Sequence, residues 1–300
     1  MGRWAKKSQK NTLNSDVYKR LSAMFEAGKG RSRNEDKRTG KDRDYIYTSR
    51  TYETYKRESK HFVSWIIANY PDVKHLSQGK KLVDTWLKEQ IDNGMSPYTI
   101  STRKAAIAKL YGMSAADLIK TPPRTRESIT RSREAVKNDT HISKTIEAKW
   151  GSITSAIGLR RAELARVRGT DLITTKDIDG NNVYWVHVHS GTKGGKSRIA
   201  VVCGKDKDDN ERIAEMFKRA GTDKVFGKIP KAYDNHHYRA VYAKRIYNRL
   251  ARNTDQIRGK DRYVMRKDRA GEVFDRKAMA EVSKYLGHNR VDVIAEHYLY

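Results

Sequence analysis

The sequence of 300 residues contains a single cysteine and only 36 acidic residues. The lone cysteine, Cys203, excludes an internal disulfide and a metal site built from several thiolates. It lies in the apolar run IAVVC, which predicts a buried thiol. The shortage of acidic residues leaves 63 lysines and arginines in excess, for a net charge of +27 and a sequence pI near 10.0. A chain with this excess is expected to bind a polyanion.

Long hydrophobic runs are also missing. No stretch of about 18 or more apolar residues occurs, and the N-terminal sequence MGRWAKKSQKN lacks the apolar segment of a signal peptide. The positive charge is spread along the chain, because residues 1–140 hold 30 basic and 16 acidic side chains and residues 141–300 hold 33 and 20. We expect a soluble, intracellular protein with no membrane partner and with two parts that both contact phosphate.

The first 118 residues divide into two regions by composition. Residues 1–45 are polar and basic, with one short helical pattern between Val17 and Gly28. The stretch after this pattern is expected to be a mobile basic linker. Over residues 46–118, apolar and aromatic residues recur at helical spacing, and lysines and arginines fall on the opposite faces. This region is predicted to be a small all-helical domain.

The rest of the chain is predicted to be a linker and a second domain. Residues 119–140 contain Pro122 and Pro123, scattered charges and almost no apolar periodicity, which is typical of an interdomain linker. Residues 141–300 begin with helices, continue with a hairpin whose strands are VYWVHVH and SRIAVV, and return to helices from about Glu211. The expected fold class is mainly α with a small β-hairpin or sheet (α+β), in two domains.

The polar faces of the helical domain carry residue types that contact phosphate oxygens in protein–DNA complexes. Solvated helix faces without a ligand are the alternative explanation for the same residues. The candidate DNA-binding residues lie on two predicted helices and are Lys56, Arg57, Lys60, Thr99, Ser101, Thr102, Arg103 and Lys104.

Several short strings in the second domain each have an ordinary structural explanation. GLRRAEL would place Arg160 and Glu163 as an ion pair on a helix surface. TKGGK would be a solvated hairpin tip, and HHYR would be the polar start of a helix. YLGHNR would be a helix end with His288 as a cap, and Tyr298 is one of 17 tyrosines.

The order of these strings is more specific than any one of them. G-L-R-x-x-E-L is followed by a hairpin lysine, H-x-x-R, L-G-H and a tyrosine ten residues later. This succession resembles the tyrosine recombinase, or phage integrase, family. The resemblance covers residues 141–300, and the helical region 46–118, with its segment SPYTISTRKAAIAKLYG, is similar to the family's core-binding domain. It implies a two-domain tyrosine recombinase architecture, with a helical core-binding domain and a mixed catalytic domain.

The resemblance also implies roles for individual residues. Two arginines would bind the scissile phosphate, a hairpin lysine and two histidines would move protons, and a tyrosine would be the nucleophile. The implied catalytic residues are Arg160, Lys193, His236, Arg239, His288 and Tyr298, with Tyr298 as the nucleophile and Glu163 in a supporting position.

The chemistry of phosphodiester cleavage agrees with these roles. Attack on phosphorus increases the negative charge on the non-bridging oxygens, which planar guanidinium groups bind better than ammonium groups do. A phenol has a pKa of about 10 and needs a neighbour to accept its proton, and His236, helped by His288, is expected to do this. The leaving 5′ oxygen needs a proton, which Lys193, with its pKa lowered by nearby arginines, is expected to donate.

The implied reaction is a transesterification in which the tyrosine joins the 3′ phosphate and a 5′ hydroxyl from a partner strand reverses the step. No metal, ATP or other cofactor is implied, and the sequence has no HExxH, no Cys/His ligand cluster and no G-x-x-x-x-G-K-[ST] string. The implied partners are double-stranded DNA, further copies of the chain in a tetramer on DNA, and accessory DNA-bending proteins. The implied location is the cytoplasm, at the nucleoid.

Two other interpretations use the same residues. A type IB topoisomerase or a hairpin telomere resolvase would perform this chemistry on another substrate, and relaxation of a plasmid without a specific site would favour it. A DNA-binding relative could keep the fold without catalysis, although the complete residue set argues against this. Tyr300 is the alternative nucleophile. Because only two residues follow Tyr298, residues 1–45 are the expected contact between protomers, unless the sequence is a piece of a longer chain.

Overall fold

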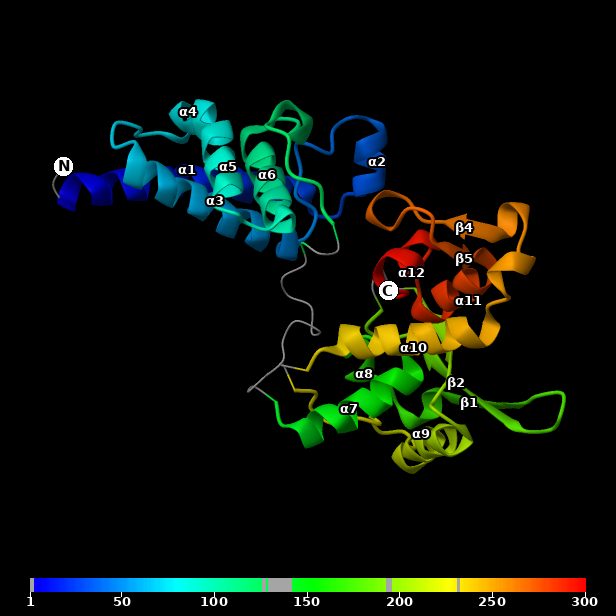
Figure 1. Cartoon of the computed structure of the whole chain (residues 1–300). Coiled ribbons are helices and arrows are strands. Elements are labelled where there is room, and N and C mark those ends of the chain that lie inside the picture. The colour runs from blue at the N-terminus through cyan, green and yellow to red at the C-terminus, as the bar shows by residue number, and fades with distance from the viewer. Residues whose placement is uncertain (1–2, 126–127, 129–141, 193–195, 231–232) are drawn as a thin grey trace. The chain divides into compact units, whose positions relative to one another are not determined.

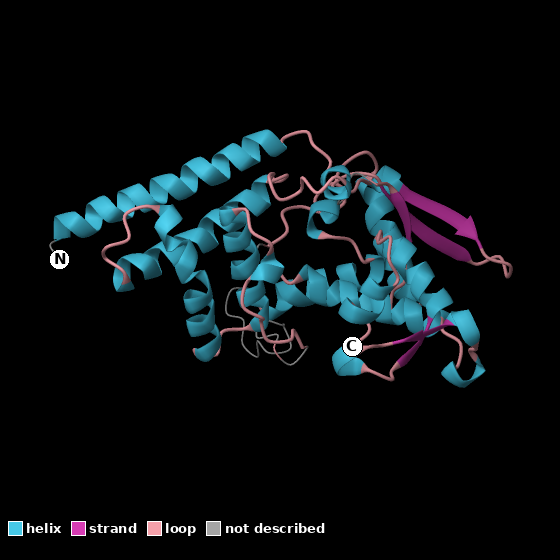
Figure 2. Cartoon of the chain, turned by 90° about the horizontal axis from the view of Figure 1, so that it is seen from above, coloured by secondary structure: helices cyan, strands magenta, loops and turns pink. Residues whose placement is uncertain are grey.

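The computed structural model describes residues 3–125, 128, 142–192, 196–230 and 233–300 (Figure 1). The chain forms two compact units, residues 1–130 and residues 131–300. Among the described residues most of the secondary structure is helical, and the strands form small antiparallel sheets (Figure 2). The predicted class, mainly α with a small β-sheet, is confirmed. No described helix combines the length and the apolar character that crossing a membrane requires.

The first unit is a bundle of helices around one hydrophobic core. Its helices are α1 (Arg3–Gly28), α2 (Arg33–Arg38), α3 (Ser49–Asn69), α4 (Leu76–Gly79), α5 (Val83–Asp92) and α6 (Pro97–Tyr111). Thr48 caps α3, because its side-chain oxygen accepts a hydrogen bond from the backbone N–H of Thr51 at 3.2 Å. Pro97 opens α6 at a position where its missing N–H costs no intrahelical bond. The apolar faces of the longer helices meet in this core, which includes Leu21 and Phe62.

The N-terminal segment differs from its prediction. Helix α1 extends well beyond the short pattern predicted from the sequence, and it packs along α3. Leu13, Val17 and Leu21 are buried in the core of the unit. Their four-residue spacing places them on one face of the helix. Residues 1–45 are therefore part of the helical unit, and the boundary predicted at residue 45 does not separate two bodies.

The predicted mobile linker after α1 is also held in place by specific contacts. Its helix α2 contains Asp36, a buried carboxylate that accepts hydrogen bonds from Arg31 at 2.5 and 3.0 Å and from the hydroxyl of Tyr47 at 3.0 Å. The ammonium of Lys109 on α6 donates to three backbone carbonyls of this segment at 2.6 to 3.3 Å. Charged side chains here fix the segment to the bundle, so basic composition alone did not indicate a linker.

The predicted interdomain linker, residues 119–140, lies largely outside the described residues. Its first residues belong to the first unit, where Ile119 packs against the core and its backbone N–H donates to Asp84 at 2.8 Å. Residues 126–127 and 129–140 lie outside the described residues, as does residue 141, where the second domain is predicted to begin.

The second unit combines helices with an antiparallel sheet in the order β1-β2-β3 and a small β4-β5 sheet. Its elements are α7 (Lys144–Ile157), α8 (Arg161–Leu164), β1 (Leu172–Lys176), β2 (Asn182–Val188), β3 (Arg198–Val201), α9 (Lys207–Ala220), α10 (Asn235–Leu250), β4 (Arg262–Val264), β5 (Val273–Asp275), α11 (Arg276–Leu286) and α12 (Asp292–His297). In the sheet, Leu172 pairs with Val186, and Trp185 pairs with Val201. The predicted hairpin strands correspond to β2 and β3. Strands β1, β4 and β5 were not predicted from the sequence; they are short and mostly not buried.

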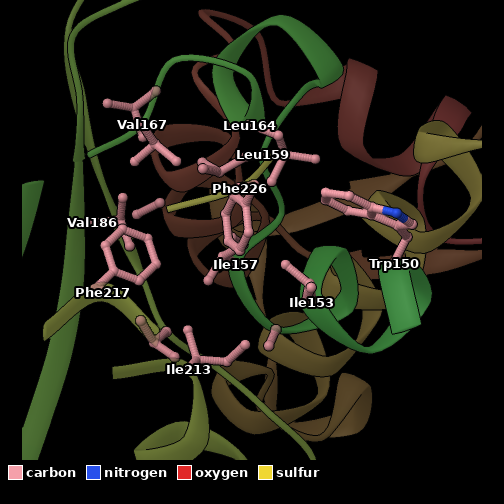
Figure 3. Close-up of a cluster of buried hydrophobic side chains, with 14 of the residues drawn as sticks. Trp150, Ile153, Ile157, Leu159, Leu164, Val167, Val186, Ile213, Phe217 and Phe226 are labelled. Atoms are coloured by element: carbon pink, nitrogen blue, oxygen red, sulfur yellow. The ribbon is translucent and has the colours of Figure 1, made fainter. Parts of the chain in front are cut away.

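Two hydrophobic cores meet in the second unit. The first lies between α7, α9 and the larger sheet, and it contains Trp150, Phe217 and Phe226 (Figure 3). The second lies around α10, α11 and α12, and it contains Tyr242 and Leu286. Helix α10 packs against both α7 and α11, so it joins the two cores. Several of the predicted catalytic residues come together around this helix.

Candidate active site

The turn between α7 and α8 presents Arg160. Helix α7 ends at Gly158, which has a φ of 59°, and a Cβ at this position would lie 2.2 Å from the ring of Tyr242 on α10, so the turn requires glycine. Arg160 follows with its side chain 17% exposed. Its Nη1 donates to Oε1 of Glu163 at 2.8 Å, and its backbone N–H donates to Oε2 at 2.7 Å. Arg160 is therefore fixed by the carboxylate but still reaches solvent.

The buried carboxylate of Glu163 is shared with a second arginine, Arg198. Nη1 of Arg198 donates to Oε1 at 2.8 Å, and Nη2 donates to Oε2 at 2.7 Å. Burial alone would raise the pKa of Glu163, but the hydrogen bonds and charge of Arg198 outweigh it and hold the pKa at about 2. Arg198 is not among the residues predicted from the sequence. A signal existed, because Arg198 shares a strand face with Ala200 and Val202, which are both buried.

Arg239 is the most deeply buried of the predicted catalytic residues that the structure describes. Its side chain is 0% exposed. Nη1 donates to the carbonyl of Gly158, Nη2 to the carbonyl of Leu286, and Nε to the hydroxyl of Tyr298 at 3.3 Å. Burial lowers the pKa of Arg239 to about 10, so its guanidinium remains charged at neutral pH. These contacts connect the ends of α7, α11 and α12 through one side chain.

Tyr298 and His288 lie next to Arg239. The Tyr298 hydroxyl is 3.1 Å from Nε2 of His288 and 3.3 Å from Nε of Arg239. His288 follows Gly287, whose φ of 66° ends α11, and the backbone N–H groups of both residues donate to carbonyls of the last helical turn at 2.9 Å. Tyr298 follows α12 and is 7% exposed. The structure thus brings the L-G-H string, the second arginine of the motif set and the predicted nucleophile together.

His236 lies in the first turn of α10 and is exposed. Asp234 accepts its backbone N–H at 3.0 Å. The surrounding protein removes some water from the ring, and this, together with the charge of Arg239, lowers the pKa of His236. Among the described contacts, the imidazole that reaches the Tyr298 hydroxyl belongs to His288. The structure therefore differs from the expected order, in which His236 leads and His288 helps, because Arg239 reaches inward from α10 while the His236 ring is exposed.

Lys193 lies outside the described residues, together with Gly194 and Gly195. Lys196, the other lysine of the same turn, is described and exposed. Within the described ranges, no group of histidine, cysteine, aspartate and glutamate side chains is arranged to hold a metal ion. Cys203 is buried, in agreement with its prediction, and burial raises the pKa of its thiol.

Two of the candidate DNA-binding residues on α6 are used inside the first unit. The side chain of Arg103 is 11% exposed, pairs with Glu58 at 3.3 Å and donates to Gln90. The ammonium of Lys104 donates to two backbone carbonyls at 3.1 and 2.6 Å. These cations satisfy acceptors of their own unit. The other α6 candidates differ in access: Thr99 is exposed, and Ser101 and Thr102 are half-buried.

The candidate DNA-binding residues on α3 are more accessible. Lys60 is exposed, Lys56 pairs with Glu53 at 2.7 Å, and the exposed Arg57 pairs with Glu58 at 2.6 Å. A surface groove of about 450 Å³ runs between α3 and α1. Its lining residues are Lys56, Lys60, Asn11, Asn14, Ser15, Val17 and Tyr18. Ammonium, amide and hydroxyl groups of this kind are suited to hydrogen bonds with phosphate oxygens.

Comparisons with known proteins give weak likenesses. Neither a protein-family model nor a curated protein matches the sequence. A solved structure of the Tn1549 transposon integrase with transposon right end DNA has a TM-score of 0.39 and 11% identity, over 82% of this chain and 89% of that one. The same integrase with circular intermediate DNA has a TM-score of 0.41 and 12% identity, over 89% and 93%. The XerA recombinase has a TM-score of 0.29 and 14% identity, over 89% and 92%. Likenesses with TM-scores this low carry no argument about the family or function of this chain.

Proposed function

We propose that this protein is a site-specific DNA recombinase, or integrase, that cleaves and rejoins duplex DNA through a 3′-phosphotyrosine intermediate. The observation that carries the proposal is the hydroxyl of Tyr298, which lies within hydrogen-bond distance of both Arg239 and His288. Attack by a phenol on a phosphodiester needs a cation for the developing charge and a group that accepts the phenolic proton. A guanidinium and an imidazole at one hydroxyl supply both.

In the proposed reaction, Arg160 and Arg239 bind the non-bridging oxygens of the scissile phosphate. The Tyr298 oxygen attacks phosphorus, and its proton passes to His288. The tyrosine–phosphate bond forms as the bond between phosphorus and the 5′ oxygen breaks. Lys193 gives the leaving 5′ oxygen its proton. A 5′ hydroxyl from another strand then attacks the phosphotyrosine, so the energy of the bond is kept and no external cofactor is consumed.

The burial of Arg239 has a consequence for this reaction. Its Nε is engaged by the Tyr298 hydroxyl, and its side chain has no solvent access. A phosphate oxygen can therefore reach Nε only when the Tyr298 hydroxyl moves aside. The two backbone carbonyls that bind Nη1 and Nη2 hold the guanidinium in place during this exchange. The incoming phosphate would thus separate the phenol from Arg239 as the reaction begins.

The proposed partners follow from the same chemistry. Both units carry an excess of positive charge, and in the first unit Lys60 and the groove beside it are the accessible candidates for the DNA backbone. Residues 141–300 are the proposed catalytic domain. Exchange of both strands between two duplexes requires four cleavages, and each tyrosine makes one, so a tetramer on DNA is the proposed active assembly, with accessory DNA-bending proteins as further proposed partners.

Trapping a covalent complex tests the proposal. The full chain is incubated with a library of random-sequence duplexes, the mixture is denatured, and DNA that remains bound to protein is sequenced. The expected product is an enriched sequence joined through its 3′ phosphate, with a free 5′ hydroxyl on the other fragment and no adduct from Tyr298→Phe.

Other outcomes distinguish the other interpretations. Adducts without any enriched sequence, together with relaxation of a supercoiled plasmid, would identify a topoisomerase instead. DNA binding without an adduct would indicate a DNA-binding protein that lacks this catalytic activity.

A further inference from the structure

Arg198 is a buried cation that the proposed reaction does not use directly. It is the first residue of β3, the return strand of the hairpin whose turn contains Lys193. Its side chain is 7% exposed. Each nitrogen of its guanidinium has an acceptor within the protein: Nη1 and Nη2 bind the two oxygens of Glu163, and Nε donates to the carbonyl of Tyr285 at 2.7 Å.

The contact between Arg198 and Glu163 affects the position of Arg160. Oε1 of Glu163 accepts Nη1 of Arg198 and Nη1 of Arg160, both at 2.8 Å. Oε2 accepts Nη2 of Arg198 and the backbone N–H of Arg160, both at 2.7 Å. Each carboxylate oxygen therefore accepts one hydrogen bond from each of the two arginines. The plane and position of the carboxylate, and with them the position of the Arg160 guanidinium, depend on Arg198.

The second contact concerns the turn that carries His288. A Cβ at Gly287 would lie 2.8 Å from Cδ of Arg198 and 3.3 Å from its Nε, so the Arg198 side chain lies directly against this glycine. The Tyr285 carbonyl, which Arg198 also binds, lies in the last turn of α11. The turn from α11 to His288 is thus packed on Arg198 and hydrogen-bonded to it.

We propose that Arg198 is a positioning residue for strand cleavage. It holds the carboxylate that orients Arg160 and the turn that orients His288, and it ties both to the strand that follows Lys193. This inference rests on the proposed function. In this assignment Arg198 binds Glu163 and the Tyr285 carbonyl, which accept hydrogen bonds from its three guanidinium nitrogens, and the phosphate is left to Arg160 and Arg239.

The planar fork of an arginine is needed for this role. Arg198 reaches the two oxygens of one carboxylate and a backbone carbonyl at the same time, which the single ammonium of a lysine cannot do in the same directions. Arg198→Lys keeps the positive charge beside Glu163 but loses the fixed geometry. A misplacement of roughly 1 Å in a group that binds the reacting atoms can reduce the rate by about 100-fold.

The matched control is Arg252→Lys. Arg252 lies in the same unit and makes the same kind of contact, with Nε and Nη2 on the two oxygens of the buried Asp275 at 2.7 and 2.8 Å.

The substrate for the assay is a duplex with the sequence enriched in the trapping experiment. It is nicked close to the scissile phosphate, so that the short fragment with the free 5′ hydroxyl departs after cleavage and the adduct accumulates. Adduct formation by Arg198→Lys at saturating DNA should be about 100-fold slower than that of the wild type. Arg252→Lys should be within about twofold of wild type, and DNA affinity should change little in both, because backbone contacts are spread over many cations.

A second substrate separates positioning from loss of folded protein. A methylphosphonate at the scissile position has no negative charge, so exact placement of Arg160 matters less for its cleavage. Relative to wild type, the deficit of Arg198→Lys should shrink to less than about 10-fold on this substrate, as should that of Arg160→Ala. The ratio of the two rates is measured in one protein sample, so the folded fraction cancels.

Three results would overturn the inference. In the first, Arg198→Lys cleaves as fast as Arg252→Lys. In the second, Arg198→Lys loses the same fraction of the wild-type cleavage rate on both substrates, which would mean that Arg198 only supports folding. An absence of adduct from the wild-type protein would instead refute the proposed function, and the role of Arg198 with it.

Discussion

Each unit of this protein contains a buried glutamate held by two arginines. In the first unit, Glu58 accepts hydrogen bonds from Arg57 at 2.6 and 2.8 Å and from Arg103 at 3.3 Å. In the second unit, Glu163 accepts hydrogen bonds from Arg160 and Arg198 at 2.7 to 2.8 Å. The two glutamate side chains are 6% and 0% exposed. The two groups have the same composition and a buried carboxylate, but Arg57 is 66% exposed, whereas Arg160 is 17% exposed.

The surroundings of the two carboxylates differ. In the first unit, the guanidinium of Arg103 lies 5.6 Å from the centre of the Trp86 ring and contacts Gln90, so it completes the packing of helices. In the second unit, the field of Arg239 also reaches Glu163, and Arg239 in turn contacts Tyr298. A buried arginine–glutamate group is therefore no sign of catalysis by itself. The contacts with Tyr298 and His288, the proposed nucleophile and proton acceptor, distinguish the second group from the first.

The largest expected difference is between one arginine of each group. Arg160→Ala should reduce adduct formation by about 100- to 1,000-fold, because one donor to the developing charge is lost. Arg57→Ala should leave the rate at saturating DNA within about twofold of the wild type, because Arg57 belongs to the first unit and the proposed active-site residues belong to the second, and a lost phosphate contact lowers affinity more than the rate on bound DNA. Single-turnover rates on the trapped sequence measure both. Normal cleavage by Arg160→Ala would remove Arg160 from the proposed site.

The proposed proton donor, Lys193, gives a second comparison. Lys193→Ala should slow cleavage by about 100-fold or more, because the leaving 5′ oxygen loses its proton donor. A substrate with sulfur at the 5′ bridging position should restore most of the rate, since a thiolate leaves without a proton. Lys196→Ala is the matched control in the same turn and should need no such rescue. If the sulfur substrate rescues Lys196→Ala and leaves Lys193→Ala inactive, the proton donor is Lys196.

Neutralising the two glutamates compares stability with activity. Glu58→Gln leaves Arg103 without its counter-charge, and Glu163→Gln leaves Arg160 and Arg198 without theirs, so each should destabilise its own unit by about 3 kcal/mol or more. Cleavage by the folded fraction should fall only in Glu163→Gln, by about 100-fold, since Arg160 loses its orientation. Urea unfolding and cleavage rates on the same samples give both quantities. Equal losses of cleavage in the two variants would erase the distinction between the groups.

The smallest expected effect concerns DNA binding by the first unit. Lys60→Ala should lower the dependence of log affinity on log salt by about one, because one fewer phosphate is neutralised. Lys88 pairs with Asp92 on another exposed helix face, and Lys88→Ala serves as the control. Titrations at several salt concentrations measure the slopes. An unchanged slope for Lys60→Ala would place the DNA contact of this unit elsewhere.

Much of the site follows from the sequence because short strings encode local geometry. Gly158 and Gly287 end helices and bring Arg160 and His288 to the turns that follow. The spacing of the strings could not show which histidine reaches Tyr298, the proposed nucleophile, since that depends on how α11 and α12 pack on α10. The contact between His288 and Tyr298 is a result of this packing.

Other features were missed for identifiable reasons. Arg198 is a single charge in a short strand, and only its place on the same face as two buried residues indicates that it points inward. In residues 1–45, Leu13, Val17 and Leu21 repeat every four residues, but the surrounding basic residues suggested an independent segment. In both places the alternation of buried and exposed positions was more informative than the charge.

Mapping the peptide that carries the covalent DNA is the most direct test of the proposed chemistry. Tyr298 and Tyr300 are close in sequence. The hydroxyl of Tyr298 lies 3.3 Å from Nε of Arg239 and 3.1 Å from Nε2 of His288, whereas the ring of Tyr300 lies 5.2 Å from the ammonium of Lys244. The predicted result is a phosphotyrosine at position 298, with an adduct still formed by Tyr300→Phe and none by Tyr298→Phe. A phosphotyrosine at position 300, or at any other tyrosine, would contradict it.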